Sequence, residues 1–262
     1  MLNAVLIGLI ILLAAVSIYL GFRLRHHSRA TKTHLDLTEA GILASGLAHE
    51  IRNPLNSIKI NMQLLQEDLE ELDMSQEERD GFVDTFRMMH EEILRLDGLM
   101  TNFLTYARPI ELKAESVELC GFLKDLLVFL QPQAAERQVE LDLDVPEEPL
   151  SLDLDVQKIR QALLNILIND IQILSTGGTV RVELKPIRDL AIIRISDNGP
   201  GMTEDFMREI FVAFRSQRKG GTGLGLSIAN RFIQAHGGGI KVESVPGEGT
   251  TFSVILPRPE MT

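Results

Sequence analysis

The chain lacks the cysteines that build disulfide frameworks, because Cys120 is the single cysteine among its 262 residues. Disulfide staples and cysteine-based zinc sites are therefore excluded, and the composition suits a reducing cytoplasm. Positive charge is also scarce, since the formal net charge is -11 at pH 7. So acidic a chain is poorly suited to non-specific binding of nucleic acid, and we expect no nucleic-acid partner.

Charge is absent from one long stretch near the N-terminus, residues 4–20. With its apolar neighbours this run is long enough to cross a bilayer core of about 30 Å. Arginine and lysine follow at once between residues 23 and 32, whereas none precedes the run, which places the following domains in the cytoplasm. A cleaved signal peptide fits poorly, because its positive charge would precede the apolar run. We expect a single-pass anchor in the inner or plasma membrane over 1–22 and a juxtamembrane linker over 23–34.

Two long apolar seams follow the linker. The first runs from Ala44 to Leu72 in steps of three and four residues, and the second runs from Phe82 to Ala107, where Pro109 ends it. Two amphipathic helices with a short connection predict an antiparallel hairpin over 35–108. A lone hairpin would expose much of its apolar surface, so we expect two chains to pair as a homodimeric four-helix bundle.

The periodicity changes after a second linker at 109–115. Helix-like and strand-like patterns mix over 116–260, which predicts an α+β class in which helices cover one face of a mixed sheet. The expected helices are 119–130 and 155–174, and the expected strands are 139–145, 179–184, 191–196, 239–245 and 251–256.

Two glycine turns in this domain point to a ligand. Gly221-Thr222-Gly223-Leu224-Gly225-Leu226 runs directly into an apolar helical pattern. A turn followed by a helix gathers unpaired N–H groups and the positive helix end at one point, which suits phosphate. The earlier turn, Asp197-Asn198-Gly199-Pro200-Gly201, places a carboxylate at the end of an apolar strand, where it could accept from an exocyclic amine. Together the two turns predict a nucleotide pocket.

This pocket resembles the ATP-binding domain of sensor histidine kinases, which belongs to a superfamily with type II topoisomerases and heat-shock-90 chaperones. The resemblance implies a Bergerat-type α/β sandwich. Four segments carry it in the family's order: Asn165-Ile166-Leu167-Ile168-Asn169, Asp197-Asn198-Gly199-Pro200-Gly201-Met202, Ile210-Phe211-Val212-Ala213-Phe214 leading into the second glycine turn, and Gly247-Glu248-Gly249-Thr250-Thr251-Phe252.

A histidine on the first seam helix has the parts of a nitrogen nucleophile. His49 lies off the apolar seam beside Glu50, and Asn53 follows one turn along the same face. The carboxylate can hold one ring proton and leave the other nitrogen free to attack a phosphoryl group. Taken alone, a histidine followed by a glutamate is more often a solvated pair, and a zinc-protease helix would need a second histidine.

The segment from Ala44 to Leu55 resembles the dimerisation and phosphoacceptor box of histidine kinases. That resemblance implies that His49 is the phosphorylated residue, that Glu50 is the general base, and that Asn53 positions water when the protein dephosphorylates its partner. Tyr106-Ala107-Arg108-Pro109 resembles the subgroup that pairs with NtrC-like regulators.

In the nucleotide site the resemblance implies that Asn169 binds magnesium with support from Asn165, that Asp197 reads adenine, and that the second glycine turn holds the phosphates. A lid between Gly201 and Gly221 is expected to close over ATP. The predicted nucleotide residues are Asn165, Asn169, Asp197, Gly199, Gly201, Phe214, Arg218, Lys219, Gly221, Thr222, Gly223, Leu224, Gly225, Leu226 and Thr250. Arg215 is a further candidate for phosphate contact, although each lid cation taken alone is more often a solvated surface residue.

Two residues depart from the family pattern. Asp170 stands where the family has alanine, and Ile173 stands where it has a small residue. An extra carboxylate beside the metal ligand could repel the triphosphate or act as an outer-shell partner of magnesium. The added bulk at position 173 is expected to crowd the site. Both changes put ATP affinity in question more than the fold.

The sequence thus predicts a membrane-anchored, homodimeric sensor histidine kinase. It would transfer the γ-phosphoryl group of Mg-ATP to His49 and then to an aspartate of a response regulator, and it would dephosphorylate that regulator through Asn53. One alternative is a degenerate scaffold that binds nucleotide or partner with little kinase activity, which Asp170 and Ile173 motivate. An ATP-gated conformational machine is the other, and the context of His49 disfavours it.

Overall fold

The computed structural model describes residues 51, 53–67, 76–174, 177–216 and 221–258. The predicted membrane anchor, the juxtamembrane linker, His49 and Glu50 therefore lie outside the described residues. None of the helices within the described ranges combines the length and apolarity needed to cross a bilayer.

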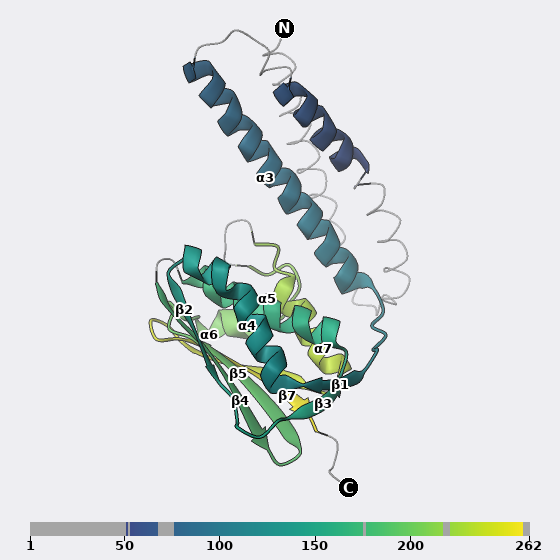
Figure 1. Ribbon diagram of the computed structural model, residues 1–262, viewed down its shortest axis with the longest axis vertical. Coiled ribbons are helices and arrows are strands. Elements are labelled where there is room, and N and C mark those ends of the chain that lie inside the picture. Colours follow the sequence, from purple (N-terminus) through teal and green to yellow (C-terminus); the bar gives the residue numbers. More distant parts are fainter. Residues whose placement is uncertain (1–50, 52, 68–75, 175–176, 217–220, 259–262) are drawn as a thin grey trace.

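Two antiparallel helices form the hairpin (Figure 1). Residues 53–67 are helical, and the long helix α3 (Gln76–Ala107) runs back beside them. Ile51 packs on the cluster that contains Met100 near the end of α3, whereas residues near 62 pack against its first half. This crossing order confirms the predicted antiparallel pairing, and α3 ends at Ala107, the last residue of the predicted second seam.

A small sheet joins the hairpin to the next domain. Strand β1 (Glu115–Glu118) pairs antiparallel with β3 (Ser151–Leu154). Helix α4 (Leu119–Glu136) starts directly after β1, because the Glu118 carboxylate accepts from the N–H groups of the first turn. The helix continues past the predicted end at residue 130, since Ala134 extends its buried face while Pro132 lies exposed. Neither β1 nor β3 was predicted.

Five strands form the main sheet, in the order β2-β4-β5-β7-β6. The strand β2 is parallel to β4 and the other neighbours are antiparallel, which confirms the mixed sheet. All five strands were predicted, and their ends lie within three residues of the expected ones. Their bounds are β2 (Val139–Asp144), β4 (Gly178–Ile187), β5 (Leu190–Asp197), β6 (Gly239–Val245) and β7 (Gly249–Pro257).

Helices cover one face of this sheet (Figure 1). Helix α5 (Val156–Ile173) and helix α7 (Gly225–Ala235) contact each other and share one hydrophobic core with α4 and the strands. A short helix, α6 (Glu204–Glu209), follows β5. The two-layer α+β sandwich is therefore confirmed, and the side-by-side placement of α5 and α7 creates the site described below.

The end of the hairpin packs against the sandwich. Phe103, Tyr106 and Ile110 are partly buried against the core of the α+β domain. The Arg231 guanidinium of α7 lies 5.0 Å from the centre of the Tyr106 ring, a cation–π contact. Helix α7 therefore contacts both the nucleotide-domain core and the last turn of α3.

Candidate functional site

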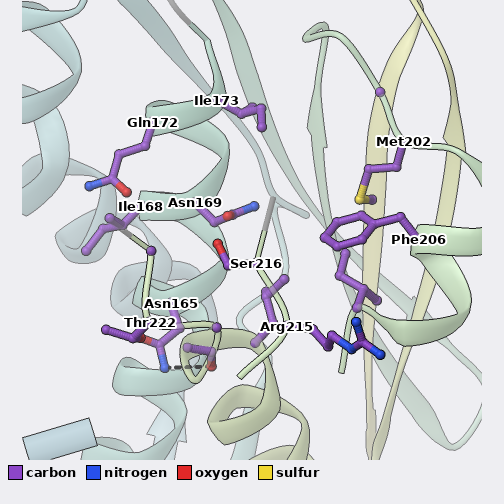
Figure 2. Close-up of a pocket in the computed structure, with 16 residues that line it drawn as sticks. Asn165, Ile168, Asn169, Gln172, Ile173, Met202, Phe206, Arg215, Ser216 and Thr222 are labelled. Carbon is purple, nitrogen blue, oxygen red and sulfur yellow. Dashed lines mark hydrogen bonds between the residues drawn. The ribbon is translucent and has the colours of Figure 1, made fainter. Parts of the chain in front are cut away.

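A cavity of about 420 Å³ lies between α5, the segment around α6, and the glycine turn that precedes α7 (Figure 2). Its size falls in the range of small-molecule sites, roughly 300–1,000 Å³. The lining residues are Asn165, Ile168, Asn169, Gln172, Ile173, Gly201, Met202, Phe206, Ile210, Arg215, Ser216, Gly221, Thr222, Gly223, Gly225 and Leu226.

Helix α5 presents two asparagines to this cavity. Its first turn is capped by Asp155, whose side chain accepts from the Lys158 N–H. Asn165 and Asn169 lie one turn apart, so both side chains reach the same side of the helix (Figure 2). The amide of Asn165 donates to the carbonyl oxygen of Gly225 at 3.0 Å. This bond joins α5 to the first residue of α7.

The first glycine turn is held tightly against the β6–β7 hairpin. Gly201 has φ +65°, and a Cβ at this position would lie 2.1 Å from the carbonyl oxygen of Val245. The next residue, Met202, donates its N–H to the Ser244 hydroxyl at 2.8 Å. Glycine is therefore required here by the close approach of a neighbouring strand.

The second glycine turn closes back on the end of the lid. Gly223 has φ +66°, and a Cβ there would lie 2.6 Å from the Phe214 carbonyl carbon. The N–H of Phe214 donates to the Gly223 carbonyl oxygen at 2.9 Å. The first hydrogen bond of α7 runs from the Ile228 N–H to the carbonyl of Leu224. The amides before Ile228 therefore precede the helical ladder and give the cavity the positive end of a helix.

Two buried carboxyl groups lie beneath the cavity. Asp197 at the end of β5 is 8% exposed and accepts from the Gly199 N–H at 2.7 Å. Burial raises its pKa, although the Gly199 hydrogen bond opposes the rise. Asp170 is 1% exposed, and burial together with the nearby charge of Asp197 raises its pKa well above the ordinary value. The Oδ2 atom of Asp170 has no hydrogen-bond partner among the described residues.

The structure brings most of the predicted site together. Eight predicted residues line the cavity: Asn165, Asn169, Gly201, Gly221, Thr222, Gly223, Gly225 and Leu226. Four others support it without lining it: Asp197, Gly199 and Thr250 at the end of the sheet, and Leu224 at the start of α7. Arg218 and Lys219 lie outside the described residues, and Asn53 is exposed on the hairpin.

Two predicted residues of the lid contact other parts of the protein. Phe214, predicted as a nucleotide residue, does not line the cavity and places its ring centre 6.4 Å from that of Phe103 in α3. Arg215, a candidate for phosphate contact, lines the cavity, and its side chain also pairs with Glu209 at 3.2 Å.

Sequence reasoning missed part of the cavity wall. Ile168 and Gln172 continue the inner side of α5, and Ser216 follows Arg215. The remaining missed residues are Met202, Phe206 and Ile210. The spacing of Asn165, Ile168, Asn169 and Gln172 at three- and four-residue steps could have identified the α5 wall.

The α5 amides fit a magnesium ion. Asn169 uses its amide nitrogen toward Asp170 Oδ1 at 3.4 Å, which leaves its amide oxygen for a cation. No group of three or more histidine, cysteine, aspartate or glutamate side chains suited to a metal occurs in the described ranges. Magnesium in this cavity would therefore combine an amide oxygen with phosphate and water oxygens, as this hard cation commonly does.

Comparison with known proteins agrees with this geometry. Residues 154–260 match the family described as "Histidine kinase-, DNA gyrase B-, and HSP90-like ATPase", and residues 40–111 match the "His Kinase A (phospho-acceptor) domain". The first match covers the sandwich from the end of β3 onward, and the second covers the hairpin.

The chain also resembles curated and solved histidine kinases. It is 33% identical over 218 residues to sporulation kinase E of Bacillus subtilis, with 83% of this chain and 28% of that protein covered. It is 32% identical over 242 residues to the sensor histidine kinase ZraS of Salmonella typhimurium, with 88% of this chain and 50% of that protein covered. The structure of full-length ShkA in complex with AMPPNP aligns with a TM-score of 0.69 at 28% identity, over 82% of this chain and 45% of that one.

The chain thus spans half or less of the length of these relatives. Both domain matches occur in the order that the sequence predicts, and the cavity between α5 and α7 lies inside the matched ATPase region. The chain belongs to the sensor histidine kinases of two-component systems.

Proposed function

We propose that this protein is a Mg-ATP-dependent histidine kinase that phosphorylates itself on His49. The cavity between α5 and α7 carries the proposal, because it combines the α5 asparagines with glycine turns and the start of a helix. These groups suit a triphosphate and its cation. The matched phosphoacceptor domain supplies the acceptor histidine.

The reaction moves one phosphoryl group. A ring nitrogen of His49 attacks the γ-phosphorus, an N–P bond forms, and the P–O bond to ADP breaks. Glu50 accepts or holds the proton on the other ring nitrogen, as its adjacent position suggests. The protein's own contribution is mainly positioning and neutralisation of charge, as is general for phosphoryl transfer. Magnesium held by Asn169 would neutralise charge on the phosphates.

A response-regulator aspartate is the proposed final acceptor. Its carboxylate oxygen attacks the phosphorus on His49, so the N–P bond breaks and an acyl phosphate forms. We further propose that the protein also dephosphorylates the regulator. In that reaction the exposed side chain of Asn53 would position the water molecule that hydrolyses the acyl phosphate. The regulator is proposed to be NtrC-like, which rests on the segment Tyr106-Ala107-Arg108-Pro109.

The hairpin supports the proposal of a homodimer. Among the residues that the structure describes, a single hairpin exposes five large apolar side chains by half or more: Ile60, Leu64, Val83, Met88 and Leu94. A surface of this kind is expected to be covered by a partner. A second hairpin would complete a four-helix bundle. The N-terminal apolar run over 4–20 is proposed to anchor this dimer in the inner or plasma membrane, with the kinase domains in the cytoplasm.

Labelling with γ-labelled ATP tests the kinase proposal. The full chain in mild detergent should acquire label that is labile in acid and stable in alkali, as expected for a phosphoramidate. His49→Gln should abolish the label, whereas His90→Gln should retain it, because His90 is an exposed histidine on α3. A purified NtrC-type receiver domain should then remove label from the parental chain. Acid-stable label, or label that survives His49→Gln, would contradict the proposal.

The degenerate scaffold remains the second candidate, and it is favoured by the buried Asp170 carboxyl, whose Oδ2 atom has no hydrogen-bond partner among the described residues. A buried carboxyl next to the magnesium-binding asparagine would disfavour an anionic triphosphate whenever it ionises. A folded dimer that binds a regulator and dephosphorylates it, yet takes no label from ATP, would establish this alternative.

A further inference from the structure

His236 joins the ends of two helices that line the cavity. It follows the last residue of α7, and its Nδ1 lies 2.7 Å from the carbonyl oxygen of Phe232 in the last turn. Its Nε2 accepts a hydrogen bond from the backbone N–H of Asp155, the cap of α5, at 3.0 Å. A neutral imidazole with the proton on Nδ1 satisfies both contacts at once, since one ring nitrogen then donates and the other accepts.

Asp155 also binds two other segments of the chain. Its carboxylate accepts from the N–H and the ammonium group of Lys158 in α5, at 3.1 and 2.6 Å. It also accepts from the N–H of Lys113 in the segment that leaves the hairpin, at 2.9 Å. The His236 contact therefore attaches the C-terminal end of α7 to Asp155, the residue that caps α5 and that also binds the Lys113 segment after the hairpin.

The two helices are thus bonded at both ends of their contact. One bond, Asn165 to Gly225, lies at the cavity, and the other, Asp155 to His236, lies at the opposite end of α7. Gly225 and His236 bracket the helix, so a change of angle between α5 and α7 has to break one of these bonds. With the Asn165–Gly225 bond alone, the C-terminal end of α7 would be free to move relative to α5.

We propose that His236 is a positioning residue for nucleotide binding, which holds α7 at a fixed distance and angle from α5 through Asp155. The inference rests on the proposed function of the cavity. Because the phosphate-binding turn precedes α7 and the magnesium-binding asparagine lies on α5, their separation depends on this angle. A chain without the Asp155 bond spends part of its time with the turn displaced. Its apparent affinity for the nucleotide then falls in proportion to the fraction of chains that are in the binding-competent state.

Three variants separate positioning from general stability. His236→Gln places an acceptor oxygen near the Nε2 position and can keep the Asp155 bond. His236→Asn can still reach the Phe232 carbonyl, but its shorter side chain falls short of Asp155. Gln234→Ala is the matched control, because Gln234 is exposed on the same last turn.

Nucleotide affinity and hydrogen exchange should be measured on the full chain, with ATP and magnesium as the probe. We expect His236→Asn to weaken ATP binding by about three- to tenfold, the value of one intramolecular hydrogen bond. His236→Gln should stay within about twofold of the parent, as should Gln234→Ala. Without nucleotide, amides 225–229, at the cavity end of α7, should exchange faster in His236→Asn alone.

The outcomes distinguish this inference from the proposed function. A parental chain that does not bind ATP would overturn the proposed function, while the exchange at 225–229 would still decide whether His236 positions α7. Equal affinity and equal exchange in all variants would overturn the positioning role. Equal losses in His236→Gln and His236→Asn would also overturn it, because the Asp155 bond would then not be the cause.

Discussion

Asn165 and Gly225 lie 60 residues apart in the sequence, yet the side-chain amide of the first donates to the carbonyl oxygen of the second at 3.0 Å. This bond links α5, which carries both asparagines, to the first residue of α7. A Cβ at Gly225 would already be in van der Waals contact with the Asn165 side chain, at 3.6 Å. The two halves of the nucleotide site are therefore built against each other before any ligand arrives.

Replacing Asn165 should weaken nucleotide binding. Asn165→Ala removes the bond to Gly225, and one such bond contributes about 0.5–1.5 kcal/mol, so the dissociation constant for ATP should rise by about two- to tenfold. Gln157→Ala is the control, because Gln157 is exposed on the first turn of the same helix. Titration calorimetry measures both. An affinity unchanged by Asn165→Ala would show that the bond does not support the site.

Removing the buried Asp170 carboxyl should stabilise the sandwich at neutral pH. Burial and the Asp197 charge raise the Asp170 pKa in the folded state, so stability is lost as pH rises above the ordinary pKa of about 3.8. Asp170→Ala should therefore raise the urea midpoint at pH 7, by a free energy of about 1–3 kcal/mol, because it removes the buried Oδ2 atom that has no hydrogen-bond partner among the described residues. The gain should shrink toward pH 4. Asp125→Ala, at an exposed helical position, should change little, and a neutral or destabilising Asp170→Ala would refute this reading.

The combined removal of Asp170 and Ile173 should tighten ATP binding. Ile173 lines the cavity, and a Cβ on Gly199 would lie 3.3 Å from its Cγ2, so the Ile173 side chain lies close to the turn beside Asp197. Alanine at both positions restores the small residues usual in the family and removes the buried carboxyl. We expect about a three- to tenfold lower dissociation constant, equivalent to roughly 1 kcal/mol. Ile168→Ala is the control within the same wall. Weaker binding by the double variant would contradict the idea that these residues limit affinity.

Neutralising Asp155 should destabilise the sandwich in a pH-dependent way. Burial opposes ionisation of this carboxyl, but hydrogen bonds from Lys158 and from the Lys113 N–H outweigh it and lower its pKa to about 2. Its contribution is therefore present above about pH 4 and lost as pH falls through about 2. Asp155→Asn keeps a helix-capping side chain, so it should lower the urea midpoint at pH 7 and progressively less below pH 4. Asp153→Asn, at an exposed position, should match the parent, and a pH-independent loss would assign the effect to packing.

Helices and strands with a strong hydrophobic periodicity could be predicted from the sequence. All five strands of the main sheet were predicted, and the predicted helix at 155–174 agrees with α5, which Asp155 caps. The small sheet of β1 and β3 was not accessible, because two four-residue strands far apart in the chain carry too little pattern. The same holds for α6, which has six residues.

The site was predictable where residue type alone specifies the chemistry. Glycines before a helix identified one side of the cavity in this way, whereas the asparagines on the other side were assigned by resemblance to the histidine kinases. The orientation of Phe214 and Arg215 was not predictable, because it depends on Phe103 of the hairpin and on Glu209. The role of His236 was missed because its partner Asp155 lies on another helix. Contacts between distant elements decide these cases, and no local pattern reports them.

The most direct test of the account is to map the phosphoryl group on the full chain after incubation with Mg-ATP, using peptide mass spectrometry at alkaline pH. The account predicts one phosphoryl group, on His49, that disappears in Asn169→Asp because that change alters the proposed magnesium ligand. It also predicts unchanged modification in Gln157→Ala. A phosphoryl group on a different residue, or one on His49 that persists undiminished in Asn169→Asp, would contradict the claim that the cavity between α5 and α7 supplies the phosphoryl group to His49.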